Sequence, residues 1–204
     1  MKSIILSSKV IIDNHQKINF LIDQDLSNFL NDLNFTVLPS VLKNNKINIK
    51  NLKYADGLIL AGGGDLFKYK KDKINKIRDN YEKKLFNYFV KKNKPILVIC
   101  RGFQLVADLN GIKLQKIKNH VRKTHNLKLN NSRFIKYSKL TVNSYHNYCI
   151  TKLPKNFLNI ASTIDNSIEI AEHKSKKILC LMFHPERKMK SQKLILQSIK
   201  KFFK

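Results

Sequence analysis

A continuous apolar run that leads directly into a helix constrains the fold of this chain more than any other feature. The run Pro95–Ile99 has no polar position, which is typical of a strand that is buried on both faces. The helix-like segment Gly102–Leu109 follows at once and is closed by Asn110 and Gly111, a pair that commonly ends helices. This order predicts an α/β protein in which helices cover a parallel sheet.

The first half of the chain alternates further strand-like and helix-like segments, as a parallel sheet wrapped by helices requires. The Lys-rich stretch Lys68–Lys76 is expected to be a solvated loop. We expect strands over Ser3–Ile12, Phe35–Pro39 and Gly57–Leu60, and amphipathic helices over Ile22–Leu33 and Ile77–Lys91.

The second half is dominated by short β-type runs. They lie within Ile135–Ile150 and Phe157–Phe183 and are separated by turn residues, which indicates hairpins added to the sheet. An amphipathic helix over Ser191–Phe203 follows them. Because there is no internal repeat, linker or break in composition, we expect residues 1–204 to form a single α/β domain.

The charge of the chain first suggests a nucleic-acid partner. Its 204 residues include 40 Lys plus Arg and 14 Asp plus Glu, which gives a net charge of +26. Only five of the basic residues are Arg, and the Lys residues are scattered among many Asn and Ile, the products of AT-rich codons. A nucleic-acid surface more often concentrates Arg and aromatic residues in one patch. We therefore expect no nucleic-acid partner.

The apolar content argues for a packed domain rather than a disordered or membrane-spanning chain. Apolar residues make up 43% of the sequence, yet no apolar run approaches the roughly 20 residues that span a bilayer. The apolar stretch within Met1–Ser8 is too short for a secretory signal and lacks a cleavage site. We expect a cytoplasmic protein without a membrane partner.

The three cysteines follow no framework pattern. Cys100, Cys149 and Cys180 are odd in number, widely spaced and contain no C-x-x-C pair, which argues against disulfides and against a structural zinc site. Cys149 and Cys180 lie within apolar runs and are expected to be core residues.

Cys100 stands where the buried strand turns into the helix. A side chain at this junction lies at the carboxyl end of the sheet, where open α/β folds bind ligands. The helix N-terminus lowers the pKa of a thiol and can hold an oxyanion, and Gly102 lets the chain pass closely. Taken alone, the motif also fits an inert, buried cysteine.

A candidate base occurs near the end of the chain. The apolar run Leu179–Phe183 leads into His184-Pro185-Glu186. Pro185 restricts His184 to extended geometry, and Glu186 is placed to orient its imidazole. A lone His-Pro-Glu would be a loop by default, so its significance comes from its combination with Cys100.

Together with the glycine-rich segment Leu58–Asp65, these motifs resemble the class I glutamine amidotransferase superfamily, and within it the γ-glutamyl hydrolase-like branch, peptidase family C26. The resemblance runs from about Ile4 to Phe203 and implies a flavodoxin-like fold, with a mostly parallel central sheet flanked by helices and extended by β-hairpins. It is strongest over Gly62–Asp65, Arg78–Glu82, Ile99–Gln104, Val142–His146 and Phe183–Arg187.

Carried over by position, the resemblance implies a γ-glutamyl hydrolase with a Cys-His-Glu triad. Cys100 corresponds to the nucleophile, His184 to the general base that then acts as acid, and Glu186 to the residue that orients His184. The family often has Gly two residues before the nucleophile, where this chain has Val98.

The resemblance also implies how the substrate is held. The oxyanion would be bound by the backbone N–H of Arg101 and by an N–H of the glycine turn, at Gly63 or Gly64. The γ-glutamyl pocket would be lined by Gln104, Asn143, Ser144, Tyr145 and His146.

Two further histidines stand near an arginine. His120 and His125 could suggest a metal pair, but no third ligand has suitable spacing. We expect them to lie in an open loop and to bind a phosphate or carboxylate of the substrate together with Arg122. The expected site holds no metal, and the reaction needs no organic cofactor.

Within the branch, the chain resembles short members found in surface-polysaccharide gene sets. This implies hydrolysis of γ-glutamyl-CDP-amidate to glutamate and cytidine diphosphoramidate, in phosphoramidate biosynthesis for capsules or other surface polysaccharides. Such a nucleotide-linked small molecule would fit a basic rim formed by Arg101, Arg122, His120 and His125.

Other functions remain open from the sequence. They are a γ-glutamyl-γ-aminobutyrate-type hydrolase, a glutaminase subunit that passes ammonia to a synthase, and a non-catalytic basic binding protein. The sequence does not define the leaving group of the substrate, and it leaves open whether the chain forms a homodimer.

Overall fold

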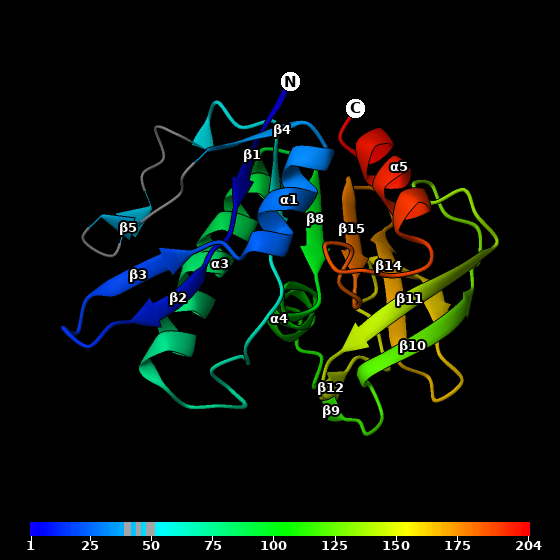
Figure 1. Cartoon of the computed structure of the whole chain (residues 1–204). Coiled ribbons are helices and arrows are strands. Elements are labelled where there is room, and N and C mark those ends of the chain that lie inside the picture. Colours follow the sequence, from blue (N-terminus) through cyan, green and yellow to red (C-terminus); the bar gives the residue numbers. More distant parts are fainter. Residues whose placement is uncertain (39–41, 44–45, 48–51) are drawn as a thin grey trace.

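The computed structural model describes residues 1–38, 42–43, 46–47 and 52–204. Its centre is a seven-stranded sheet in the order β13-β14-β15-β8-β7-β1-β4 (Figure 1). Strands β15, β8, β7, β1 and β4 pair in parallel, whereas β14 is antiparallel to both β13 and β15. The strands are β1 (Lys2–Leu6), β4 (Phe35–Leu38), β7 (Gly57–Leu60), β8 (Ile96–Ile99), β13 (Phe157–Ser162), β14 (Ile168–His173) and β15 (Ile178–Leu181).

Two layers of helices cover the sheet. Helices α1 (Gln24–Asp32) and α5 (Gln192–Phe202) pack into the core on one face, and α3 (Lys73–Lys91) and α4 (Arg101–Leu109) pack into the core on the other (Figure 1). Alternate side chains of β8 enter the two cores, so this strand is buried on both faces as its apolar run predicts. The predicted α/β class is confirmed.

The described part of the chain contains no helix with both the length and the apolar character needed to cross a membrane. The longest described helix, α3, instead places charged residues between the apolar ones of its buried face. It begins at Lys73 because the Asp72 side chain accepts a hydrogen bond from the Asn75 N–H at 2.7 Å. The prediction of a loop over Lys68–Lys76 is therefore wrong for Lys73–Lys76, which lie in α3.

The predicted first strand, Ser3–Ile12, is interrupted. β1 ends at Leu6, and β2 (Lys9–Ile12) leaves the sheet to form a hairpin with β3 (Ile18–Leu21). Ser7 marks the break, because its hydroxyl accepts a hydrogen bond from the Ala61 N–H at 2.8 Å. Of the predicted strand Phe35–Pro39, Pro39 lies outside the described residues.

A long hairpin stands beside the central sheet. It consists of β10 (Val121–Lys128) and β11 (Lys139–Tyr145), so the open loop expected around His120 and His125 is wrong. The side chains of β10 are mostly exposed, which leaves little apolar periodicity to reveal the strand. Shorter pairs are β9 (Gln115–Lys116) with β12 (Tyr148–Cys149), and β5 (Leu42–Lys43) with β6 (Lys46–Ile47).

Candidate active site

Three adjacent parallel strands end where the predicted catalytic motifs begin. The register pairs Leu60 of β7 with Val98 of β8, and Ile99 of β8 with Leu181 of β15. The glycine turn, Cys100 and His184 follow these strands and therefore meet at one edge of the sheet. This is the carboxyl edge, where α/β proteins bind ligands.

Cys100 occupies a strained junction between β8 and α4. Its backbone has φ 46° and ψ −102°, a left-handed conformation that L-residues rarely adopt. A Cβ on Gly102 would lie 2.8 Å from the Leu60 Cβ and 2.9 Å from the Leu60 carbonyl oxygen. Glycine at this position therefore allows α4 to begin directly against β7, which fixes the turn that carries Cys100.

His184 is paired with Glu186. Their Nδ1 and Oε1 atoms are 2.6 Å apart, and both side chains are buried. The second carboxylate oxygen, Oε2, is buried and has no hydrogen-bond partner among the described residues. A charged Glu186 accepts the Nδ1–H, which leaves the other ring nitrogen free to exchange a proton with a neighbour.

Cys100 is that neighbour, and it perturbs the imidazole. Burial alone lowers the pKa of His184, but the charge and hydrogen bonding of Cys100, followed by those of Glu186, raise this pKa to about 10. A cationic imidazole beside a thiolate is the form in which a cysteine acts as a nucleophile. The geometry therefore places Cys100 where it can exchange a proton with His184.

Asn143, predicted as a pocket residue, clamps the main chain of His184 instead. Its Nδ2 donates to the His184 carbonyl at 2.8 Å, and its Oδ1 accepts from the His184 N–H at 2.9 Å. Tyr145 packs edge-on against the imidazole, with ring centroids 5.8 Å apart. β11 thus fixes the position of His184 from one side.

Gly62 fixes it from another side. A Cβ on Gly62 would lie 2.6 Å from the His184 Cε1 and 3.4 Å from the Cys100 Cβ. Because no side chain fits between the turn and these two residues, the glycine turn can approach the reacting atoms. The sequence predicted that the glycine turn lies close to the substrate, but it did not indicate the contact between Gly62 and His184.

Arg78 orients the glycine turn from behind. Its guanidinium donates to the carbonyl oxygens of Ala61 and Gly62 at 3.0 Å each and to that of Gly63 at 2.6 Å. In a planar trans peptide the next N–H points away from the carbonyl. The N–H groups of Gly63 and Gly64 therefore point away from Arg78, as donors to an oxyanion would have to.

The Arg101 side chain belongs to the same buried network. It donates to the carboxylates of Glu82 and Asp79 and is fully buried, so the expectation that it contacts an anionic substrate is wrong. Burial raises the pKa of Glu82, but the charges of Arg101 and Arg78 outweigh burial and hold it below its ordinary range. The i,i+4 spacing of Arg78 and Glu82 on α3 is the sequence signal for this network.

A cavity of about 250 Å³ opens above Cys100. A larger hollow of about 600 Å³, near Met1 and Phe35, lies at the amino end of β1 and β4, away from these groups. Residues lining the cavity at Cys100 are Gly63, Gly64, Asp65, Cys100, Gln104, Tyr145, His146, Asn147, Tyr148, His184 and Arg187.

The predicted pocket residues divide into two groups. Gln104, Tyr145 and His146 line the cavity, and the Gln104 Nε2 donates to the Tyr148 carbonyl at 2.9 Å. Ser144 is fully buried behind the wall, where its hydroxyl donates to the His120 carbonyl at 2.6 Å. The strand alternation of β11 explains why neighbouring residues of this motif face different ways.

Of the predicted anion-binding group, His120 and His125 lie together, with ring centroids 4.3 Å apart. His120 is buried and its Nε2 lies 2.9 Å from the Asp165 Oδ2, so it faces a carboxylate rather than an anion in solution. Arg122 is exposed on β10, and burial lowers the pKa of His125. Arg187, to which no role was assigned, lines the catalytic cavity with its guanidinium 4.5 Å from the Tyr145 ring centroid.

Comparisons with known proteins identify the family of the chain. The sequence profile of the peptidase C26 family matches residues 33–186. The γ-glutamyl-CDP-amidate hydrolase of Campylobacter jejuni is 34% identical over 154 residues, covering 76% of this chain and 72% of that protein. The glutamine-hydrolysing GMP synthase subunit of Methanosphaera stadtmanae is 29% identical, and the match covers 88% of each chain.

A solved structure supports the fold independently. A Thermoplasma acidophilum protein described as a GMP synthase subunit superimposes with a TM-score of 0.74 at 23% identity, covering 100% of this chain and 94% of that one. The predicted class I glutamine amidotransferase fold is confirmed. The chain belongs to the peptidase C26 family and is a hydrolase of γ-glutamyl or glutamine amides.

Proposed function

We propose that this chain is a cysteine-dependent hydrolase that releases glutamate from γ-glutamyl-CDP-amidate. The observation that carries the proposal is the convergence of Cys100, His184 and Glu186 at the carboxyl edge of the sheet. The choice of this substrate is supported by the 34% identity to the C. jejuni hydrolase. The product of such a reaction would serve phosphoramidate modification of surface polysaccharide.

In the proposed acylation step, the Cys100 thiolate attacks the γ-carbonyl carbon of the glutamyl group. The negative charge passes to the carbonyl oxygen, which accepts hydrogen bonds from the Arg101 N–H and an N–H of Gly63 or Gly64. His184 donates its proton to the departing nitrogen while the C–N bond breaks. A γ-glutamyl thioester remains on Cys100.

In the proposed deacylation step, water replaces the leaving group in the cavity. His184, now neutral and oriented by Glu186, takes a proton from the water as its oxygen attacks the thioester carbon. Collapse of the tetrahedral intermediate breaks the C–S bond, releases glutamate and restores the thiolate beside the imidazolium.

A glutaminase subunit is the second candidate. It is favoured by the 29% identity to the M. stadtmanae GMP synthase subunit over 88% of both chains. In that case the substrate is glutamine, the leaving group is ammonia, and a synthase partner would raise the rate of hydrolysis. The same three side chains would act in the same order.

A substrate panel separates the two candidates. Glutamate release is measured with γ-glutamyl-CDP-amidate, γ-glutamyl-γ-aminobutyrate and glutamine, for the wild type and Cys100→Ala. We expect the nucleotide amidate to have the highest kcat/KM and Cys100→Ala to reduce it at least about 10⁴-fold. Preference for glutamine would favour the glutaminase, and full activity of Cys100→Ala would exclude both.

A further inference from the structure

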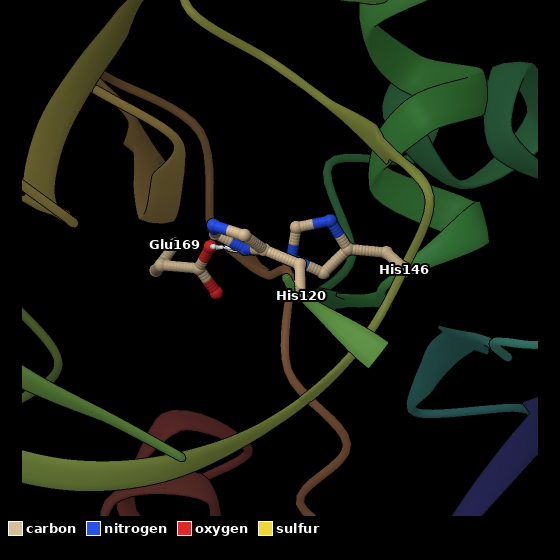
Figure 2. A group of neighbouring side chains, drawn as sticks. All are labelled: His120, His146 and Glu169. Carbon is tan, nitrogen blue, oxygen red and sulfur yellow. Dashed lines mark hydrogen bonds and ion pairs between the residues drawn. The ribbon is translucent and has the colours of Figure 1, made fainter. Parts of the chain in front are cut away.

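A second group of titratable side chains lies beside the catalytic cavity and takes no part in the proposed reaction. His120 precedes β10, His146 follows β11, and Glu169 lies in β14. All three are buried, and Figure 2 shows their side chains pointing toward one another. They join the open end of the β10–β11 hairpin to the central sheet.

The distances within this group match the spacing of ligands around one ion. The His120 Nδ1 is 3.3 Å from the His146 Nε2, which is 3.3 Å from the Glu169 Oε1. The His120 Nδ1 and the Glu169 Oε1 are 3.9 Å apart. Nitrogen and oxygen ligands about 2.0–2.1 Å from a tetrahedral zinc ion are roughly 3.3 Å from one another. Small side-chain movements would place all three around one ion.

The outer nitrogens of the two imidazoles face hydrogen-bond acceptors, which favours the tautomers with the proton on these nitrogens. The His146 Nδ1 lies 3.1 Å from the Tyr148 carbonyl, which can only accept, and the His120 Nε2 lies 2.9 Å from the Asp165 carboxylate. In neutral imidazoles, the inner nitrogens therefore present lone pairs to each other and to Glu169. Metal-binding histidines characteristically donate their other N–H to a carbonyl or carboxylate in this way.

Glu169 supplies a further sign that a cation belongs here. Its Oε1 accepts from the Ser167 hydroxyl at 2.8 Å, but its Oε2 is buried and has no hydrogen-bond partner among the described residues. A buried carboxylate oxygen without a partner is destabilising. A cation at the two histidines would satisfy it if the carboxylate bound through both oxygens or turned Oε2 toward the ion.

We propose that His120, His146 and Glu169 bind one divalent first-row transition-metal ion, for which Zn²⁺ is the best match. Two imidazoles and a carboxylate are a typical zinc donor set, and a fourth position would remain for water. A cavity of about 390 Å³, lined in part by His120, His125 and Asp165, gives access from the surface. The sequence excluded a metal here because the other ligands, His146 and Glu169, are distant along the chain.

The expected effect of the ion is positional. It would tie the start of β10 and the end of β11 to β14 and thereby hold His146, which also lines the catalytic cavity. The reaction proposed above does not pass through the metal, and the metal site does not depend on the identity of the substrate.

Zinc binding to the untagged full chain tests the proposal. The measurements use a Cys100→Ser background, because the Cys100 thiolate and His184 could themselves bind zinc. Chelator-treated protein is titrated with Zn²⁺ against a fluorescent competitor, and the melting temperature is recorded in parallel. We expect about one tightly bound ion per chain and a higher melting temperature with zinc. Glu169→Gln should abolish both effects.

Matched variants separate ligand loss from general damage. Glu172→Gln removes another buried carboxylate of β14, one that accepts from Ser132 on the opposite face of the strand, and should bind zinc like its parent. Asp165→Asn removes a half-exposed partner of His120, and should weaken zinc binding about 10–100-fold without unfolding the chain.

Three results would overturn the proposal. They are no tight zinc binding by the parent, equal binding by Glu169→Gln, or, if that variant does not fold, equal binding by Asp165→Asn. The assay measures bound metal rather than hydrolysis, so an absence of zinc binding would not count against the proposed γ-glutamyl hydrolase reaction. Conversely, inactivity toward every γ-glutamyl compound would not count against the metal site.

Discussion

His184 is held in place by Glu186 of its own loop and by residues from other segments of the chain. Asn143 fixes its main chain, Glu186 binds its Nδ1, and Gly62 leaves space against its Cε1. Cys100 then raises its pKa despite burial. The proposed reactivity therefore depends on residues from four segments of the chain, and each can be tested separately.

The pKa of His184 should depend directly on Cys100. We expect an NMR titration of the imidazole to give about 10 in the wild type and a clearly lower value in Cys100→Ser, because the nearby negative charge is removed. An unchanged pKa in Cys100→Ser would show that the thiolate and imidazolium are not coupled.

The same shift makes stability depend on pH. The folded pKa lies above the unfolded value of about 6.5, so the associated stabilisation is fully present below pH 6.5. It is lost as the pH rises through about 10. We expect the difference in free energy of unfolding between the wild type and His184→Gln, measured with urea, to decrease over this range. A difference independent of pH would contradict the assignment.

Asn143 should act on kcat rather than on substrate binding. Asn143→Ala removes the hydrogen bonds that position His184, and a displacement of this kind can lower kcat about 10²-fold. Asn130→Ala, which removes an exposed amide near the other end of the hairpin, is the control. A raised KM with unchanged kcat would show that Asn143 contacts the substrate instead.

Elements with continuous apolar runs were predictable, and those that depend on distant partners were not. β7, β8 and β15 follow from their sequences because each is buried on both faces. β10 is exposed and polar, and only its pairing with β11 makes it a strand. The catalytic motifs could be found because they follow such apolar strands. The group at His120 could not be found because it depends on the pairing of β10 with β11.

The junction of β8 with α4 should be sensitive to a single methyl group. Gly102→Ala would place a Cβ against the Leu60 side chain and carbonyl oxygen, and would force α4 away from β7. We expect a loss of about 1–3 kcal/mol in the free energy of unfolding, measured with urea. A loss below about 0.5 kcal/mol would mean that the close packing is not required.

The arginines that contribute to the net charge of +26 are spread over the molecule rather than gathered at one site. Of these arginines, Arg78 and Arg101 are buried with Glu82, and Arg133 pairs with Glu172. Only Arg187 lines the catalytic cavity. The charge available to the proposed anionic leaving group is therefore local, and it lies at Arg187, to which the sequence analysis assigned no role.

The two arginines outside these ion pairs, Arg122 and Arg187, should differ in their effect on a nucleotide-linked substrate. Arg187→Gln should raise KM for γ-glutamyl-CDP-amidate about 10–100-fold, as expected for loss of a charged contact, with a smaller effect on glutamine. Arg187→Lys should recover part of the loss. A larger effect of Arg122→Gln would instead place the anionic group near β10.

The covalent intermediate tests the central claim most directly. Protein turning over γ-glutamyl-CDP-amidate is quenched in acid within milliseconds and digested, and the Cys100 peptide is examined by mass spectrometry. We expect this peptide to carry a γ-glutamyl group as a thioester, which hydroxylamine removes. Turnover with Cys100 unmodified at every quench time, together with glutamate release by Cys100→Ala at the wild-type rate, would contradict the account.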